Sequence, residues 1–425
     1  MSASALAYDG PDAPDRMRNE HADTTQKDAP VGPHEDKLKD TATEHASFEM
    51  AAYQDDDAVT VLTPSIALSI DNTNGATLSA SYLVDVVSAA SVDVISTASK
   101  PFHEVRQAGS LYGEYKPHDF GVGVGTSVSR EPDYLSYGAF ATVRKDLSEK
   151  NWSLFFGYGF GHDTAGRCGD DGQCTPFSVF SRTLLRTTFN GGFDLVVDKL
   201  SLLTVTGDVI VENGDQSKPY RYVPMFTPEA AALVHKGMTI DQVNKLANPS
   251  PNAPPGSNTG RSDERPLEQL PLSRHRFALT AKYARRMGFT TLRAMERLYD
   301  DTWGLMASST DVRLIFDLGK RFAIWPHARF NIQHEVNFWK LAYISYGAAS
   351  GQWNLPEYRT GDRELGPLWT AGGGFGVKWY IGPSGEPERF ALQLTADAMY
   401  TSFLNDLYVT GRLATVGALG AEGSF

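Results

Sequence analysis

Three successive runs between residues 119 and 163 alternate apolar side chains with small polar ones. In the first run Phe120, Val122 and Val124 alternate with Gly121 and Gly123, and the later runs keep the same period of two. Because successive side chains of a β-strand point to opposite faces, this pattern predicts three consecutive amphipathic strands.

The polar face of these strands distinguishes between two kinds of sheet. A soluble sandwich also alternates apolar with polar residues, but its polar face is usually turned to water. Here that face is mainly glycine and serine, and each run has the roughly 10 residues that a tilted membrane strand needs. We therefore predict an all-β fold, a transmembrane antiparallel β-barrel with its apolar side chains towards lipid, in preference to a soluble sandwich or barrel.

The same period predicts fourteen strands along the chain. They are 76–88, 102–116, 119–130, 134–145, 151–163, 177–190, 199–211, 273–286, 288–299, 305–318, 321–334, 367–381, 388–402 and 412–425. Residues 59–70 show the period as well. Since bacterial barrels of this type have an even number of strands, this segment either pairs at the rim or has a partner that the pattern does not reveal. About fourteen strands are therefore predicted, and sixteen are possible.

The connections between these strands alternate in length. Short turns such as Lys116-Pro117-His118 alternate with long segments, of which 212–272 and 335–366 are the longest. In bacterial outer-membrane barrels the short turns are periplasmic and the long loops external. Both termini are therefore expected on the periplasmic side, and 212–272 is expected to form an external loop insertion.

The acidity of the chain is concentrated at its start. Residues 1–57 supply −9 of the net charge of −12, and they show no strand or helix period. This composition predicts a disordered acidic tail, with the barrel at 58–425. Ala5-Leu6-Ala7 has the form of a signal-peptidase site without an apolar segment before it, so residues 1–7 are a candidate remnant of a signal peptide.

The face opposite the apolar one is expected to line the lumen, and it is rich in cations. The candidate lumen-lining basic residues are Arg106, Arg144, Arg182, Arg186, Arg274, Arg276, Lys282, Arg293, Arg297, Arg313 and Arg329. Lys378, Arg389 and Arg412 share this face, against the carboxylates of Asp85, Glu114, Asp208, Asp311, Asp317, Asp397 and Glu422. A net basic lumen is predicted. It would attract anions if it holds water, or stiffen a closed barrel if its charges pack as ion pairs.

The two cysteines, Cys168 and Cys174, flank a short acidic and glycine-rich segment of a predicted external loop. A local disulfide is the expected state in an exported protein. The alternative is a metal site in which both thiolates bind with Asp170 and Asp171, although the usual zinc-ligand spacing is missing.

Sequence motifs give little support for an enzyme. The chain has no run of roughly 18 apolar residues, which excludes a membrane helix. It also lacks a phosphate-binding glycine loop, a zinc signature and a dinucleotide fingerprint, so no cofactor, metal or nucleic-acid partner is expected. His103, His162, His275 and His334 lie near predicted strand ends, where a lipid hydrolase embedded in the outer membrane would place its catalytic groups, but no nucleophile motif accompanies them.

An ordered series of short motifs resembles a known family. These motifs are Tyr53-Gln54-Asp55-Asp56, Val84-Asp85-Val86-Val87, Asp133-Tyr134-Leu135-Ser136, Pro219-Tyr220-Arg221-Tyr222-Val223-Pro224, Leu270-Pro271-Leu272-Ser273-Arg274-His275-Arg276 and Asp300-Asp301-Thr302-Trp303-Gly304. The series is similar to a family of bacterial outer-membrane barrels catalogued as a domain of unknown function, and it covers nearly everything after Tyr53. The resemblance implies fold and location and no activity. Met295–Tyr299 departs from a more tyrosine-rich run of the family, and 225–262 looks like an insertion.

Helix signals mark the insertion. Thr227-Pro228 offers an N-cap followed by proline at the first helical position, and Thr239 with Gln242 forms a capping box. Two short helices are expected before the proline-rich stretch 249–255. They would either fold into the mouth as a constriction or cover it from outside, and we favour the outside cover.

These features together predict a bacterial outer-membrane barrel that acts as a passive pore or small-solute transporter with a basic lumen favouring small anionic solutes. The alternatives are a structural closed barrel and an outer-membrane lipid hydrolase. Outer-membrane lipid is an expected partner. The assembly machinery is another, because the final strand alternates and ends on Phe425, which resembles the signal that this machinery reads.

Overall fold

The computed structural model describes residues 42–89, 102–169, 173–218, 221–223, 225–236, 238, 242, 266–344, 355–382, 390–405, 407 and 409–425. Expectations for the tail before residue 42, for Arg389 and for the proline-rich stretch of the insertion lie outside the described residues. No helix among the described residues is both long and apolar enough to cross a membrane.

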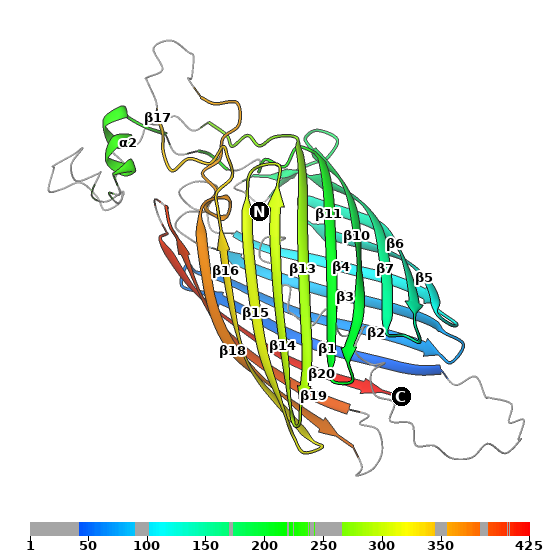
Figure 1. The fold of residues 1–425 in the computed structure, drawn as a ribbon. Coiled ribbons are helices and arrows are strands. Elements are labelled where there is room, and N and C mark those ends of the chain that lie inside the picture. The colour runs from blue at the N-terminus through cyan, green and yellow to red at the C-terminus, as the bar shows by residue number, and fades with distance from the viewer. Residues whose placement is uncertain are drawn as a thin grey trace, which may run out of the picture. The chain divides into compact units, whose positions relative to one another are not determined.

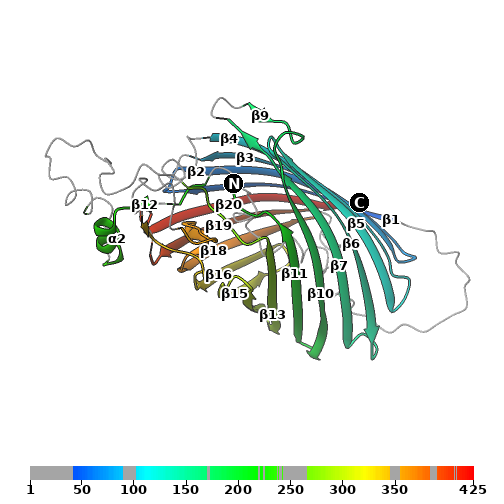
Figure 2. The ribbon, with the colours of Figure 1, turned by 90° about the horizontal axis from the view of Figure 1, so that it is seen from above.

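Sixteen antiparallel strands form one closed barrel. Figures 1 and 2 show how these strands follow one another around the ring. In order around the ring they are β1 (Ala42–Asp55), β2 (Val59–Asn72), β3 (Ala76–Ala89), β4 (Phe102–Tyr115), β5 (Phe120–Glu131), β6 (Tyr134–Leu147), β7 (Trp152–Ala165), β10 (Arg182–Asp198), β11 (Ser201–Gly214), β13 (Ser273–Met287), β14 (Thr290–Asp301), β15 (Met306–Leu318), β16 (Phe322–Gln333), β18 (Leu368–Ile381), β19 (Phe390–Phe403) and β20 (Gly411–Ser424). The predicted all-β antiparallel barrel is confirmed.

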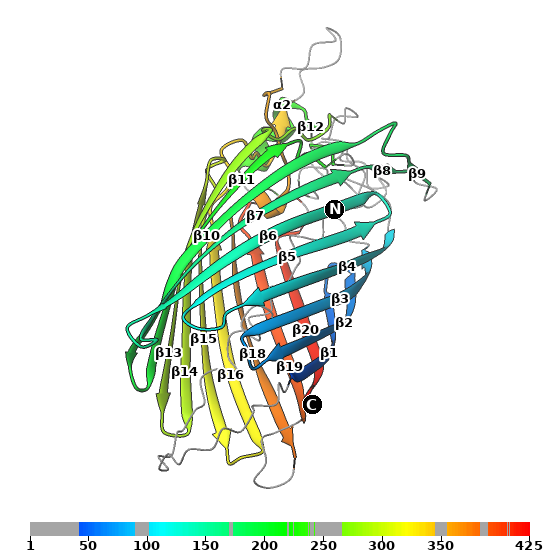
Figure 3. The same cartoon turned by 90° about the vertical axis from the view of Figure 1, so that its right-hand side faces the viewer.

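The ring closes between its first and last strands. β1 pairs with β2 on one side and with β20 on the other, and Figure 3 shows the two terminal strands side by side. The strand predicted at 59–70 is β2, and its missing partner is β1. This corrects the boundary at residue 57, because Ala42–Asp55 belongs to the barrel and not to the acidic tail.

Apolar side chains cover the outer face of the barrel. Val124, Leu68 and Phe156 are at least half exposed there, while the alternate positions of the same strands turn inward. Glu296 is an exception at the middle of β14. Its carboxylate lies on the outer face and accepts hydrogen bonds from the hydroxyls of Ser308, at 2.6 Å, and Thr310.

The two ends of the barrel differ in their connections. At one end, which we call the short-turn end, β1 begins, β20 ends and tight turns such as 73–75 and 288–289 join the strands. At the opposite, long-loop end, residues 215–272 join β11 to β13, and residues 334–367 join β16 to β18. The predicted alternation of short and long connections is confirmed.

The long-loop end carries the remaining short elements. They are β8 (Arg167–Cys168), β9 (Cys174–Thr175), β12 (Met225–Phe226), α2 (Pro228–His235), β17 (Tyr343–Ile344) and the 3₁₀ turn η3 (Arg363–Leu365). The first predicted helix of the insertion is α2, and its N-cap Thr227 accepts a hydrogen bond from the Ala230 amide at 3.3 Å. Figures 1 and 2 place α2 beyond this end and outside the ring of strands.

Candidate functional site

Two long loops pack on each other at the long-loop end, and together we call them the cap. β12 and β17 pair in parallel, so that residues 225–226 of one loop lie beside 343–344 of the other. The cap has its own apolar interior, in which Phe226, Val234 and Ala342 are buried together. This packing explains why the described core of the protein lies largely in its loops.

Buried polar groups hold the centre of the cap. The Tyr343 hydroxyl accepts a hydrogen bond from the Thr360 amide at 2.9 Å, and the Thr360 hydroxyl donates to Glu268 at 2.5 Å. Asp362 binds the side chains of Lys218, at 3.1 Å, and Arg221. Burial raises the pKa of the Tyr343 hydroxyl above its usual range, so this group stays neutral at any ordinary pH.

The cap is fastened to the rim near the closure of the ring. The Arg363 guanidinium pairs with Asp57 in the β1–β2 turn at 2.9 Å, and Arg412 of β20 pairs with Glu364 at 3.2 Å. Both guanidinium groups lie over the ring of Phe403, at 4.9 and 5.6 Å from its centroid. The 334–367 loop is therefore bound to strands on both sides of the β1–β20 junction.

Beneath the cap, all eleven predicted lumen-lining basic residues lie on the inward-facing positions of barrel strands. Within the described part of the chain, eight of them have a carboxylate partner: Arg106 with Asp85, Arg144 with Asp194, Arg182 with Asp215, Arg186 with Asp163, Arg274 with Asp301, Arg276 with Glu212, Arg297 with Asp208 and Arg329 with Asp311. Most of these cations are therefore not available as free positive charge.

The prediction of a net basic lumen needs correction, because the inward face holds more carboxylates than the sequence pattern indicated. The additional ones are Glu49, Asp55, Asp71, Glu104, Glu131, Asp146, Asp163, Asp194, Glu212 and Asp301. Most of them lie within a few residues of a strand end, where the observed strands run past the predicted boundaries. They neutralise much of the arginine charge.

The two signs of charge lie on different arcs of the ring. Along β1–β7 the inward carboxylates outnumber the inward arginines, which include Arg106 and Arg144. We call this arc of the ring the acidic wall. Along β10–β16 the inward cations predominate, and we call this arc the basic wall. Strand order places the two walls across the lumen from each other.

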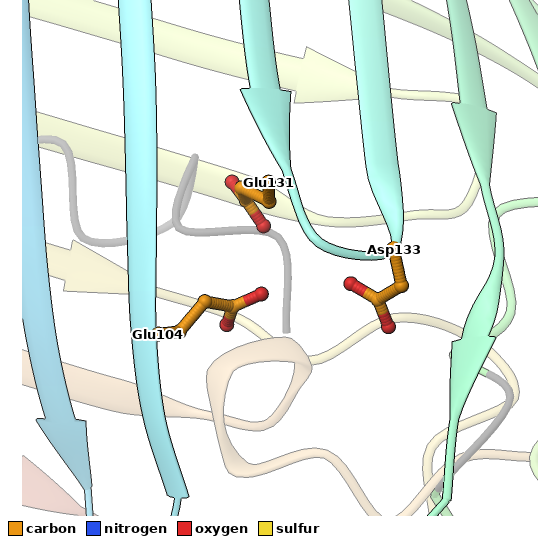
Figure 4. A group of neighbouring side chains, drawn as sticks. All are labelled: Glu104, Glu131 and Asp133. Carbon is orange, nitrogen blue, oxygen red and sulfur yellow. The ribbon is translucent and has the colours of Figure 1, made fainter. Parts of the chain in front are cut away.

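Two carboxylates of the acidic wall and one from the β5–β6 turn converge at the long-loop end (Figure 4). One oxygen from each of Glu104, Glu131 and Asp133 lies within 4.8 Å of the others, and Glu131 is only 7% exposed. Oxygen ligands suit Ca²⁺, but that ion takes six to eight of them, so these three groups alone are an incomplete site.

Arg293 differs from the other arginines of the basic wall. Among the described residues, no carboxylate lies within ion-pair distance of its guanidinium. Its direct neighbour on β15 is a second arginine, Arg313, and its neighbour on β13 is Ala284.

A serine, a histidine and an aspartate meet at the short-turn end, where the sequence singled out none of them. The Ser424 hydroxyl lies 2.9 Å from Nδ1 of His45, and Nε2 of the same ring lies 3.4 Å from Asp71. The histidines named from the sequence are placed elsewhere: His162 stacks on Tyr137 of the outer face, for example. Since β1 and β20 are neighbours only after closure, no local motif could have indicated this group.

The two cysteines form a small hairpin at the long-loop end. β8 pairs with β9 through Cys168 and Cys174, and the structure joins the two sulfurs in a disulfide.

Comparison with protein families identifies the chain. A model described as "Protein of unknown function (DUF3570)" matches residues 92–424. The chain belongs to the DUF3570 family. The resemblance seen in the sequence motifs is thereby confirmed. No curated protein matches the chain.

Several solved structures share the barrel architecture with this DUF3570 chain at very low sequence identity. CdiB from Acinetobacter baumannii is 8% identical with a TM-score of 0.47, and the match covers 90% of this chain and 60% of that one. The outer membrane proteins opdK and OprD from Pseudomonas aeruginosa are 7% and 6% identical, with TM-scores of 0.42 and 0.41, over 91% and 90% of this chain and 99% and 94% of theirs. The chain spans only about 60% of the length of CdiB.

Proposed function

We propose that this protein lies in a bacterial outer membrane and serves there as a passive pore for small hydrophilic solutes. The observation that carries the proposal is a closed ring of sixteen strands with an apolar outer face and a charged inner face. Barrels of 16 to 18 strands are wide enough to leave an aqueous channel, whereas barrels of about 8 strands are filled by side chains. The apolar outer face is the surface that lipid requires.

The two charged walls change the expected selectivity of the pore. A uniformly basic lumen would favour anions, but here an acidic arc faces a basic one. A solute that carries both signs, or a strong dipole, can orient between the two walls and keep favourable contacts with each. The pore should therefore discriminate only weakly between K⁺ and Cl⁻, because the acidic wall attracts the cation and the basic wall attracts the anion.

Planar lipid bilayers test this proposal. Purified protein should give stepwise conductance, with a reversal potential near zero in a KCl gradient. Neutralising Asp71 and Glu114 of the acidic wall to Asn and Gln should shift the reversal potential towards anion preference. Neutralising Arg293 and Arg297 to Gln should shift it towards cation preference. Absence of any current from folded protein would contradict the pore and favour a structural closed barrel.

A second candidate function rests on Ser424, His45 and Asp71. With Nδ1 unprotonated, His45 can take the proton of Ser424 as that hydroxyl attacks an ester carbonyl, while Nε2–H faces Asp71. The hydrolase is second because its His45–Asp71 distance of 3.4 Å exceeds an ordinary hydrogen bond, and because ion pairs of this kind are common along a polar lumen.

A fluorophosphonate probe separates the two candidates. A hydrolase should be labelled at Ser424, and Ser424→Ala should abolish both the label and the hydrolysis of a soluble ester. The matched control is Ser127→Ala, a serine on the inward face of β5 far from any of the three groups along the strand order. Folded wild-type protein that neither reacts with the probe nor cleaves esters would leave this group a structural contact of the ring closure.

A further inference from the structure

Two hydrogen-bond donors lie side by side on the outer face of the barrel near the long-loop end. Gln107 of β4 and Arg130 of β5 are directly opposite each other in the antiparallel pair, and both side chains are exposed. Residues opposed in this way have Cβ atoms roughly 4.5–5.5 Å apart, so one ligand can reach both. Arg130 is the last residue but one of β5, which places the pair close to the rim.

The polar protons of this pair have no acceptor in the described part of the chain. The Tyr82 hydroxyl donates to Oε1 of Gln107 at 3.2 Å, which leaves the amide nitrogen with both of its protons. No carboxylate of the described residues lies within ion-pair distance of the Arg130 guanidinium. The flanking positions on the adjacent strands are apolar, with Val84 beside Gln107 and Leu135 beside Arg130.

The carboxylates at this end of β4 and β5 are directed to the other side of the sheet. Glu131 and Asp133 gather with the inward Glu104, as Figure 4 shows. Arg130 points the opposite way from Glu131, because consecutive residues of a strand face opposite sides. Its guanidinium is therefore presented to the lipid side of the barrel.

A hollow adjoins the guanidinium at the rim. It has a volume of about 190 Å³ and is lined by Arg130, Glu131, Pro132, Tyr134, Leu135 and Phe177. Phe177 belongs to the segment between β9 and β10, in which Val179 is 75% exposed. Apolar side chains exposed beside the lipid face are better matched to acyl chains than to water.

Aromatic side chains mark the depth of this pair of donors. The hydrogen-bonded row through Val128 carries Tyr82 on β3 and Tyr137 on β6. Both rings are nearly half exposed on the outer face. In outer-membrane barrels such aromatic residues lie at the interface between membrane and water. Arg130 is two residues nearer the rim than Val128, so its guanidinium lies at the level of the lipid head groups.

We propose that Arg130 and Gln107 bind the phosphate of an outer-leaflet lipid, whose acyl chains lie along Val128 and the apolar side chains beyond it. The guanidinium fork and the amide N–H groups both donate to phosphate oxygens, and the guanidinium supplies the opposite charge. This site goes beyond the proposed pore, because it lies on the outer face and needs no conduction. It rests on the proposed membrane location for its ligand.

Lipid binding by the purified full-length protein in detergent micelles tests the site. The probe is dioleoyl phosphatidic acid. Dioleoylglycerol has the same chains without the phosphate, and inorganic phosphate has no chains. Native mass spectrometry should show saturable binding of phosphatidic acid and much weaker binding of dioleoylglycerol. Displacement of the lipid by inorganic phosphate at equal concentration would reveal a site for free anions and contradict the lipid assignment.

Arg130→Gln should weaken the binding of phosphatidic acid about tenfold, which is the usual effect of losing one hydrogen bond to a charged group. Gln107→Leu should weaken it by a smaller factor. The matched control is Arg285→Gln, because Arg285 is an exposed outer-face arginine of the short-turn end that pairs with Asp198 at 3.5 Å. It should bind as the wild type does, and heat-modifiable migration on gels verifies that each variant is folded.

Equal affinity of the wild type and Arg130→Gln for phosphatidic acid, or equal binding of the two lipids, would overturn the site. The bilayer conductance of Arg130→Gln should match that of the wild type, because the side chain lies outside the lumen. Failure of the lipid site and failure of the pore are therefore separate results.

Discussion

At the residue scale, the direction in which a side chain points decides its tolerance to charge. Val124 is 61% exposed on the outer face near the middle of β5, while Ser127 of the same strand points inward beside Gly138. The inward glycines of β5 are unsuitable for comparing a charge on the two faces, because any side chain there would clash. A side chain at Gly125 would overlap the ring of Phe140, and one at Gly123 would overlap Tyr112.

Val124→Arg should therefore hinder folding into lipid vesicles. The expected loss is roughly 2–4 kcal/mol, which is the usual cost of an arginine on the lipid face at the bilayer midplane. Ser127→Arg is the matched inward substitution and should cost much less. Urea titration of both variants in vesicles measures the difference, and equal losses would contradict the assignment of the two faces.

The face of the sheet on which a charged residue lies was easier to predict than the residue with which it forms an ion pair. Period two placed each of the eleven candidate cations on the correct face, because parity along a strand is a local property. The ion pairs depend instead on which strands are neighbours and on where each strand ends. Glu131, Glu212 and Asp301 lie just past the predicted ends of their strands, so the balance of charge in the lumen could not be deduced.

At the element scale, β1 is the strand that the sequence concealed. Its outer face has only two large apolar side chains, Phe48 and Met50, and the strand as a whole carries three carboxylates, Glu44, Glu49 and Asp55. Its composition therefore resembles that of the acidic residues before it, and the strand period is weak. The local sequence favours a strand here only weakly, and the backbone hydrogen bonds to both β2 and β20 hold the segment in strand conformation.

This role of β1 predicts a sharp difference between two truncations. Removal of residues 1–41 should leave folding into detergent or lipid intact, because the barrel begins at Ala42. Removal of residues 1–55 should prevent it, since β2 and β20 would each present an unpaired edge to lipid, where backbone groups have no water to bond. Heat-modifiable migration on gels reports the folded barrel. A folded product from the longer truncation would show that β1 is dispensable.

At the scale of the whole molecule, the cap at the long-loop end and the charged lumen below it have different structural roles. The cap is bound through Arg363 and Arg412 to strands beside the closure, so it braces the junction of β1 with β20 at the long-loop end. The acidic wall and the basic wall lie below the cap. Negative and positive charges are separated because the strands that carry them occupy different arcs of the ring. None of this could be predicted without the ring order, because Arg363 and Asp57 are 306 residues apart in the sequence.

The closure also sets the timing of assembly. His45 and Ser424 face each other across a sequence separation of 379 residues, so the contact that completes the ring is among the most distant that this chain makes. Contacts of such separation form slowly, because a long stretch of chain must be ordered before they contribute. Fourteen of the sixteen strands can pair with both neighbours while the ring is still an open sheet. Loss of β20 alone would then leave nearly every hairpin formed but no closed barrel. While the sheet remains open, the protein is exposed to proteases and to pairing with wrong strands.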